Sequence, residues 1–210
     1  MKRAALLCSL VAVVIVGLSL WGGRTTIHHG GPVSGGSSSS ADGDRLGLGQ
    51  AFSFGGVVLF NRANQPAVLE KIRILGVTGG LEILGVRTNP APLSPTMYNF
   101  LGAFGFPPDR YPSHPFPEDH VVPVAKTRTK SGEPNEGLQI VIGARATHPG
   151  VARVRAVEFT YRVGHRRYRN SYEGSMYLCA PKEQFTAETC PGDAEGKFDN
   201  VNVEVKIPQA

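Results

Sequence analysis

From about residue 48 onward, apolar and polar residues alternate in short stretches that are typical of β-strands. In residues 154–163, polar residues separate Val157, Phe159 and Tyr161, which is the two-residue period of a strand with one buried face. Gly164 and His165 follow as a hairpin turn with glycine at its first central position. The same reasoning predicts eight strands in all: residues 52–60, 66–75, 81–87, 138–147, 154–163, 166–170, 175–179 and 201–207.

This succession of short strands, with no helical pattern among them, predicts an all-β fold. Two antiparallel sheets packed face to face are the natural arrangement for such strands. The abundance of glycine and proline, 26 and 16 of 210 residues, also favours turns and strands over long helices. We therefore expect one β-sandwich domain over residues 46–210.

The N-terminal segment has a different character, because residues 4–23 carry no charge. As a helix this run would span roughly 30 Å, the thickness of the hydrocarbon core of a bilayer. Lys2 and Arg3 precede it, and Trp21 lies at its far end. Positive residues favour the cytoplasmic side. We predict a signal-anchor helix that crosses the cell membrane once, with residues 1–3 in the cytoplasm and the remainder extracytoplasmic.

A cleaved signal peptide is the alternative for the same segment. Its apolar region would be shorter, and it would end at a site with small residues around the scissile bond. The apolar run here is longer, and residues 17–21 (GLSLW) offer no convincing cleavage site of this kind, so the sequence favours an uncleaved anchor. Cleavage would change the tether and not the compartment.

Residues 24–45 are rich in glycine and serine and contain few apolar residues. Such a segment buries too little surface to offset the entropy lost on ordering, so we expect a flexible stalk. His28 and His29 lie within it, and we interpret them as polar filler and not as metal ligands.

The chain has three cysteines. Cys8 lies in the apolar N-terminal run, where it acts as a small hydrophobic residue. Cys179 and Cys190 bracket a short polar loop on the predicted extracytoplasmic side. An oxidising compartment favours pairing, so we predict a disulfide between them.

Several segments resemble a known class of envelope proteins. Residues 58–61 (VLFN), 66–69 (PAVL) and 72–74 (IRI) look like the opening strands of immunoglobulin-like envelope modules. Residues 149–151 and 157–161 are similar to the late hairpin of these modules. The layout resembles the uncharacterised single-pass, anchored envelope proteins of high-GC Gram-positive bacteria. This resemblance implies an immunoglobulin-like sandwich behind the anchor, and it carries over no catalytic residue.

Motifs of common enzymes are missing from the sequence. It contains no G-x-S-x-G, no H-E-x-x-H, no P-loop and no G-x-G-x-x-G opening a helix. We expect a protein that is not an enzyme and that uses no cofactor. The cluster of His114, Glu118, Asp119 and His120 does not have the ligand spacing of a standard site, and the acidic run 193–200 lacks the late glutamate of a calcium loop. We therefore expect no metal site.

Positive charge gathers in residues 126–169, where ten lysines and arginines face three glutamates. Such a field could attract anionic lipid headgroups or wall polymers. Nucleic acid is not expected outside the cytoplasm. The other interpretation is a solvated sheet face whose arginines pair with the acidic C-terminal strands. The arginines selected as candidate binding residues are Arg153, Arg155, Arg166, Arg167 and Arg169.

The last feature is the long connection over residues 88–122, which is rich in proline and aromatic residues. Connections of this length are uncommon in compact domains and are often functional. Phe104, Phe106 and Tyr111 are its candidate binding residues. They form either a low-entropy binding surface or a flap that closes one side of the sandwich, and the sequence leaves both open.

Three hypotheses for function follow. The first is a non-enzymatic envelope module that binds a protein partner or a cell-envelope polymer. The second is a structural or accessory subunit of a membrane complex. The third and least favoured is a metal- or lipid-handling domain.

Overall fold

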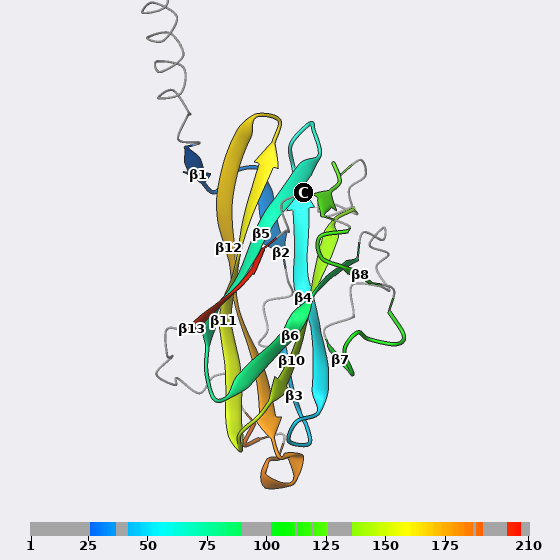
Figure 1. Ribbon diagram of the computed structural model, residues 1–210, viewed down its shortest axis with the longest axis vertical. Helices are drawn as coiled ribbons and strands as arrows, with labels where there is room; N and C mark the ends of the chain where they lie inside the picture. The colour runs from blue at the N-terminus through cyan, green and yellow to red at the C-terminus, as the bar shows by residue number, and fades with distance from the viewer. Residues whose placement is uncertain are drawn as a thin grey trace, which may run out of the picture.

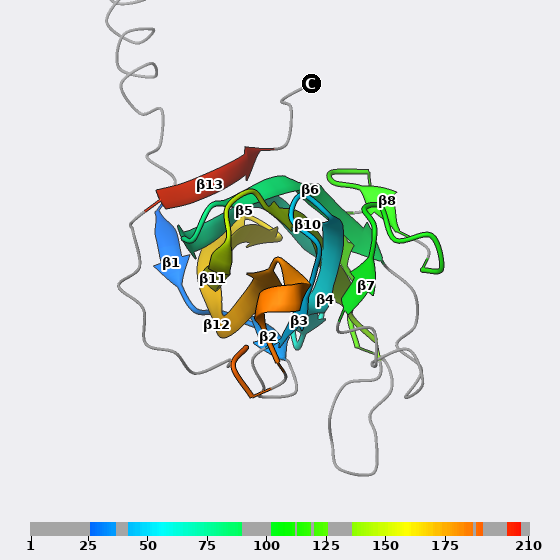
Figure 2. The same ribbon diagram turned by 90° about the horizontal axis from the view of Figure 1, so that it is seen from below.

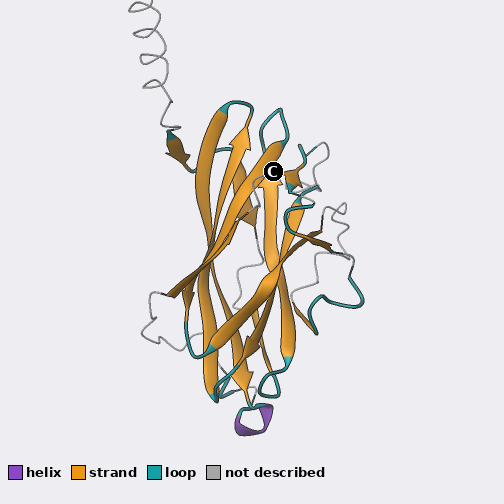
Figure 3. Ribbon diagram, viewed as in Figure 1, coloured by secondary structure: helices purple, strands orange, loops and turns teal. Residues whose placement is uncertain are grey.

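The computed structural model describes residues 26–36, 42–89, 102–111, 113–118, 120–125, 136–186, 188–190 and 201–206. Within these residues the chain is all-β apart from the short 3-10 helix η1 (Lys182–Gln184). Two sheets face each other along an elongated molecule (Figures 1 and 3). The all-β prediction is confirmed, and the two facing sheets are consistent with a sandwich.

The principal strands coincide with the predicted ones to within a few residues. The predicted segments 166–170 and 175–179 are parts of one long strand, β12. The strands are β4 (Ala51–Asn61), β5 (Ala67–Val77), β6 (Leu81–Asn89), β10 (Leu138–Ala146), β11 (Gly150–Val163), β12 (Arg166–Ala180) and β13 (Val201–Lys206).

Within the described part of the chain, a seven-stranded sheet has the order β1-β12-β11-β5-β13, and a six-stranded sheet has the order β2-β4-β10-β6-β8. Short strands extend the edges: β3 and β9 join β12 and β5 of the first sheet, and β7 joins β4 of the second. The short strands of the two sheets are β1 (Ile27–His29), β2 (Val33–Gly36), β3 (Asp42–Arg45), β7 (Gly102–Phe104), β8 (His114–Pro115) and β9 (Val121–Val122).

The predicted alternation of faces holds in the core. Val157, Phe159 and Tyr161 of β11 are fully buried and face the other sheet, together with Ile140 and Ile142 of β10. The long strands pair in antiparallel fashion, as predicted. β1 and β3 depart from this pattern because both run parallel to β12.

The predicted stalk is wrong for much of its length, since three strands lie within it. β1 pairs with β12 in the seven-stranded sheet, and β2 pairs with β4 in the six-stranded sheet. β3 then returns to β12. We call residues 27–36 and 42–45 the crossover segment. They bridge the same pair of sheet edges, which Figure 2 shows along the side of the sandwich.

The glycines that suggested flexibility instead allow close packing against tyrosine rings. A Cβ atom on Gly31 would lie 2.5 Å from the Tyr161 hydroxyl, and one on Gly43 would lie 2.3 Å from the Tyr177 ring. Real Cβ atoms do not approach neighbours so closely, so larger residues would separate the crossover segment from the sheet. The crossover segment has few apolar side chains to bury, and its backbone hydrogen bonds to β4 and β12 hold it in place instead.

Tyr161 fastens the crossover segment to the core. Its buried hydroxyl donates a hydrogen bond to the Gly30 carbonyl oxygen (2.9 Å) and accepts one from the Val33 N–H (3.1 Å). Burial raises the pKa of Tyr161, and the Val33 hydrogen bond partly offsets this shift. The folded domain therefore favours the neutral form of the Tyr161 side chain. Val33 itself is fully buried, so the segment contributes to the core.

The predicted membrane helix, residues 4–23, lies outside the described residues. Among the residues that are described, no helix is long and apolar enough to cross a membrane.

Candidate binding surfaces

The outer face of the seven-stranded sheet carries rows of paired charges. On one row, Glu158 of β11 lies between Arg73 of β5 (Nη1–Oε1 2.9 Å) and Arg169 of β12 (Nε–Oε1 3.8 Å). Glu204 of β13 continues the row through its ion pairs with Lys71 and Arg73. The alternation of sign across four neighbouring strands lowers the net charge of this face.

A second row crosses the same sheet nearer the β11–β12 turn. Glu70 of β5 forms ion pairs with Arg162 and Arg167. These pairs are partly exposed, so each contributes at most about 1 kcal/mol to stability. These pairs also bear on binding. An anionic ligand would have to displace Glu70 before it could pair with Arg162 or Arg167. Arg167 and Arg169 are thus part of a paired face, but their partners Glu70 and Glu158 lie on β5 and β11 and not on the C-terminal strands.

The five candidate arginines do not form one cluster. Arg153 is buried, and its backbone N–H and carbonyl bond to Thr78 in the β5–β6 turn, far along β11 from the β11–β12 turn. The Arg153 side chain therefore offers little surface to a ligand. Arg155 is exposed and lies over Gly76. Only Arg166 and Arg167 lie together at the hairpin turn, with Arg169 a few residues further along β12.

The long connection folds back over the six-stranded sheet. We call its described residues 102–111 and 113–118 the flap. β7 pairs with β4 on one side of the sheet, and β8 pairs with β6 on the other. Ser53 donates a hydrogen bond to the Gly105 carbonyl (2.6 Å), and Arg87 donates to the Ser113 hydroxyl (2.9 Å). Figure 1 shows β7 and β8 on this side of the molecule.

Phe106 occupies a hollow formed by two glycines. A Cβ atom added at Gly143 of β10 would lie 2.2 Å from its ring, and one at Gly85 of β6 would lie 3.2 Å away. The side chain is half-buried on the outer face of the sheet. Phe116, further along the flap, reaches the core cluster. These two residues therefore act as a structural flap.

Phe104 and Tyr111 behave differently from Phe106. Phe104 is 60% exposed, although its ring contacts Phe52 edge to face at 6.1 Å between centroids. Tyr111 is 39% exposed. Leu48, in the turn that leads into β4, is 48% exposed. Phe104 pairs with Phe52 near the start of β4, so exposed apolar side chains occur both just before β4 and beside its first residues.

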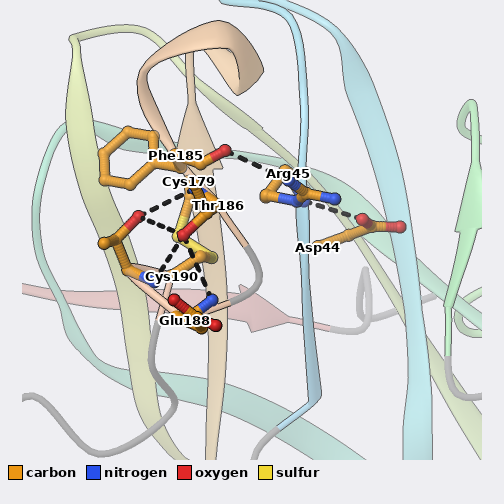
Figure 4. Close-up of a disulfide and its surroundings, with 8 residues drawn as sticks. Asp44, Arg45, Cys179, Phe185, Thr186, Glu188 and Cys190 are labelled. Carbon is orange, nitrogen blue, oxygen red and sulfur yellow. Dashed lines mark hydrogen bonds between the residues drawn. A yellow bond between two sulfur atoms is a disulfide. The ribbon is translucent and has the colours of Figure 1, made fainter.

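The predicted disulfide between Cys179 and Cys190 is present, with its Cα atoms 6.0 Å apart. It closes a loop (Figure 4) that lies at the opposite end of the sandwich from the β11–β12 turn (Figure 1). Thr186 organises this loop, because its carbonyl accepts a hydrogen bond from the Cys190 N–H (3.1 Å). Arg45 of β3 donates to the Phe185 carbonyl (3.1 Å), which ties the loop to the crossover segment.

Replacing both cysteines by serine should destabilise the domain by about 2 kcal/mol, because the unfolded chain gains the entropy of an open loop. The measurement is chemical denaturation under non-reducing conditions. Adding a reductant should produce the same change in the wild type and none in the double variant. A wild type whose midpoint ignores the reductant, despite proven reduction, would contradict the expectation.

Sequence reasoning missed several residues that shape these surfaces. Tyr161 was recognised as a core residue, but its bonds to the crossover segment were not foreseen. The concentration of positive charge in residues 126–169 does not point to Arg62 or Glu70, because both lie outside that stretch. The only sequence signal for Arg62 is its position between two predicted strands, and Glu70 lies within the strand predicted over residues 66–75. Within the described residues, no group of three or more histidines, cysteines or acidic residues is arranged to hold a metal.

Comparison with protein-family models finds no family that matches the chain, and comparison with curated proteins finds no similar sequence.

Proposed function

We propose that the protein is a membrane-anchored, extracytoplasmic module of immunoglobulin-like type, which catalyses no reaction and binds a protein partner of the cell envelope. The observation that carries this proposal is the exposure of Phe104 on a strand that is hydrogen-bonded to the sandwich. The disulfide supports an oxidising location, since such bonds persist outside the cytoplasm. The uncharged run 4–23 supports the anchor.

A rigidly held aromatic side chain suits a protein interface. Phe104 loses little backbone entropy on binding, because β7 is already paired with β4. Exposed apolar side chains that gather in one place mark interaction sites more often than isolated ones do. Leu48 supplies a second exposed apolar residue near the start of β4. Aromatic side chains of this kind contribute a large share of binding energy when a partner buries them.

An anionic wall polymer is a weaker candidate for the outer face of the seven-stranded sheet. There the arginines of β11 and β12 already share Glu70 and Glu158. A polyanion would have to displace carboxylates held by cross-strand geometry. A structural or accessory subunit of a membrane complex differs from our proposal only in the permanence of the contact.

The test replaces Phe104 by alanine in the full chain. Because the side chain is mostly exposed, the free energy of unfolding should change by less than about 0.5 kcal/mol. A photoreactive phenylalanine analogue at position 104 should form a discrete protein cross-link in intact source cells. The same analogue at exposed Glu183, which lies in the disulfide loop, is the matched control.

Three results would count against the proposal. Cross-links to wall fragments alone would favour a polymer ligand, and equal cross-linking at positions 104 and 183 would remove the special role of Phe104. Protease added to intact, wall-stripped cells provides the check on topology. Full protection of the domain would overturn its extracytoplasmic placement.

A further inference from the structure

We propose that the β11–β12 end of the sandwich rests on the membrane and binds anionic lipid headgroups, which orients the domain with its disulfide loop pointing away. This inference rests on the proposed membrane anchor and adds a lipid-binding surface to it. We call the surface the basic end, and it consists of the β4–β5 turn, the β11–β12 turn and the strand residues beside them.

The first argument is the short distance between the proposed anchor and the fold. Without a stalk, residues 24–26 alone separate the end of the uncharged run from Ile27, the first residue of β1. Four residue steps span at most about 14 Å when fully extended. Ile27 pairs with Arg167, just after the β11–β12 turn. The basic end must therefore lie close to the surface from which the chain emerges.

The second argument is that the elements of the basic end touch one another. A Cβ atom on Gly164 would lie 3.1 Å from the Gln65 side-chain oxygen, so the two turns are in contact. The Arg62 N–H donates to the Pro32 carbonyl (2.9 Å), and the Gly30 N–H donates to the Arg169 carbonyl (2.8 Å). Figure 1 shows β1 and the β11–β12 turn at the same end.

The third argument is the charge of this end. Among the described residues, four arginines lie at this end against two glutamates, Glu70 on β5 and Glu136 just before β10. The arginines are Arg62, Arg162, Arg166 and Arg167. Arg162 and Arg167 share Glu70. Arg62 and Arg166 are exposed, and no ion pair to either occurs among the described residues.

The opposite end shows no such excess. Acidic and basic side chains balance among the residues that are described there, and two of them neutralise each other in a bidentate pair. Arg145 donates hydrogen bonds to both carboxylate oxygens of Glu82 (2.8 and 3.0 Å), which lowers the pKa of Glu82. In the described part of the chain, the charged residues near that end are Asp44, Glu82, Glu183 and Glu188 against Arg45, Arg145, Arg153 and Lys182.

An electrostatic contact of this type acts over about 8 Å at physiological ionic strength. The tether holds the basic end within that range or slightly beyond it, so the local concentration of headgroups is high without strong intrinsic affinity. Two exposed arginines then suffice to bias the orientation, because each basic residue near an anionic surface is attracted to it. In this orientation the exposed side chains of Phe104 and Leu48 lie away from the membrane, where a partner can reach them.

The test uses the full chain reconstituted in vesicles of phosphatidylglycerol mixed with phosphatidylcholine, and in vesicles of phosphatidylcholine alone. In a Cys8→Ser background, a fluorophore is attached at His165→Cys or at Glu183→Cys. A lipid with a nitroxide on its headgroup serves as the quencher. We expect quenching several-fold stronger at position 165 than at 183 in the anionic vesicles, reduced by added salt and by removing phosphatidylglycerol.

Charge reversal separates lipid binding from the effect of the tether. Arg62→Glu with Arg166→Glu should reduce quenching at position 165 in anionic vesicles to its level in neutral ones. Arg155→Glu with Lys182→Glu makes the same change in net charge away from the basic end and should leave it unaltered. Equal quenching at both positions, or quenching at 165 that ignores lipid charge and charge reversal, would overturn the inference. Failure of the wild-type chain to float with vesicles would instead overturn the proposed anchor.

Discussion

A chain that begins at residue 46 should fail to fold into a stable domain, whereas one that begins at residue 26 should unfold cooperatively. The difference between the two chains is the crossover segment, for which the amino-acid pattern predicts a flexible stalk outside the domain. Its removal opens the edges of β4 and β12 and leaves the Tyr161 hydroxyl without the partners that it has at Gly30 and Val33.

The size of the effect follows from these contacts. Burial of Val33 contributes about 2 kcal/mol, and the two hydrogen bonds of Tyr161 contribute about 1 kcal/mol each. The sum is a large part of the 5 to 15 kcal/mol that usually stabilises a domain. Unpaired edges also invite association between chains, so we expect the shorter chain to aggregate.

Thermal unfolding followed by circular dichroism distinguishes the two chains. Tyr161→Phe in the chain that begins at residue 26 is the matched control. It removes the hydroxyl alone and should lower the free energy of unfolding by about 1 to 3 kcal/mol, since the Val33 N–H stays buried without its acceptor. Equal unfolding midpoints for chains beginning at residues 26 and 46 would show that the crossover segment is not needed.

Much of the sandwich could be predicted because its long strands obey a simple rule. Val157, Phe159 and Tyr161 alternate with polar residues because one face of β11 packs on the core and the other forms the outer face of the sheet. The disulfide could be predicted as well, because two cysteines that flank a short loop in an exported domain usually pair. Both predictions rest on local patterns of residues.

The crossover segment escaped prediction because its stability is not local. Gly31 and Gly43 are informative only beside Tyr161 and Tyr177, which lie more than one hundred residues away in the sequence. A glycine that admits a ring and a glycine in a flexible linker look alike until the partner is known. Composition alone therefore favoured a stalk where backbone pairing gives strands.

The grouping of the charged candidates in space was hidden from the sequence for a similar reason. The count of arginines in residues 126–169 ignored which of them share a carboxylate, and Glu70 comes from a distant strand. Arg62 belongs with Arg166 only because two turns, about one hundred residues apart, touch through Gln65 and Gly164. Charge density along the chain is thus a poor guide to charge density in space when a sheet interleaves its strands.

The flap provides the second large effect, and a double-mutant cycle measures it. Phe106→Ala should destabilise the domain by about 2 to 3 kcal/mol, less than a fully buried phenylalanine because the ring is half-exposed. Gly143→Ala should cost about 1 to 3 kcal/mol, because its new Cβ atom would occupy space that the Phe106 ring now fills. Chemical denaturation of the full-length protein and its variants gives both values.

The decisive quantity is the coupling between the two changes. In the Phe106→Ala background the hollow is empty, so Gly143→Ala should cost little, and an alanine in a strand could even be slightly favourable. The double variant should therefore be close in stability to Phe106→Ala alone. Phe104→Ala is the control within the same flap, because Phe104 lies away from Gly143 and should give additive effects with Gly143→Ala. Additivity of Phe106→Ala and Gly143→Ala would mean that the ring does not rest on β10 in solution, and the flap would then be free to serve as a binding surface.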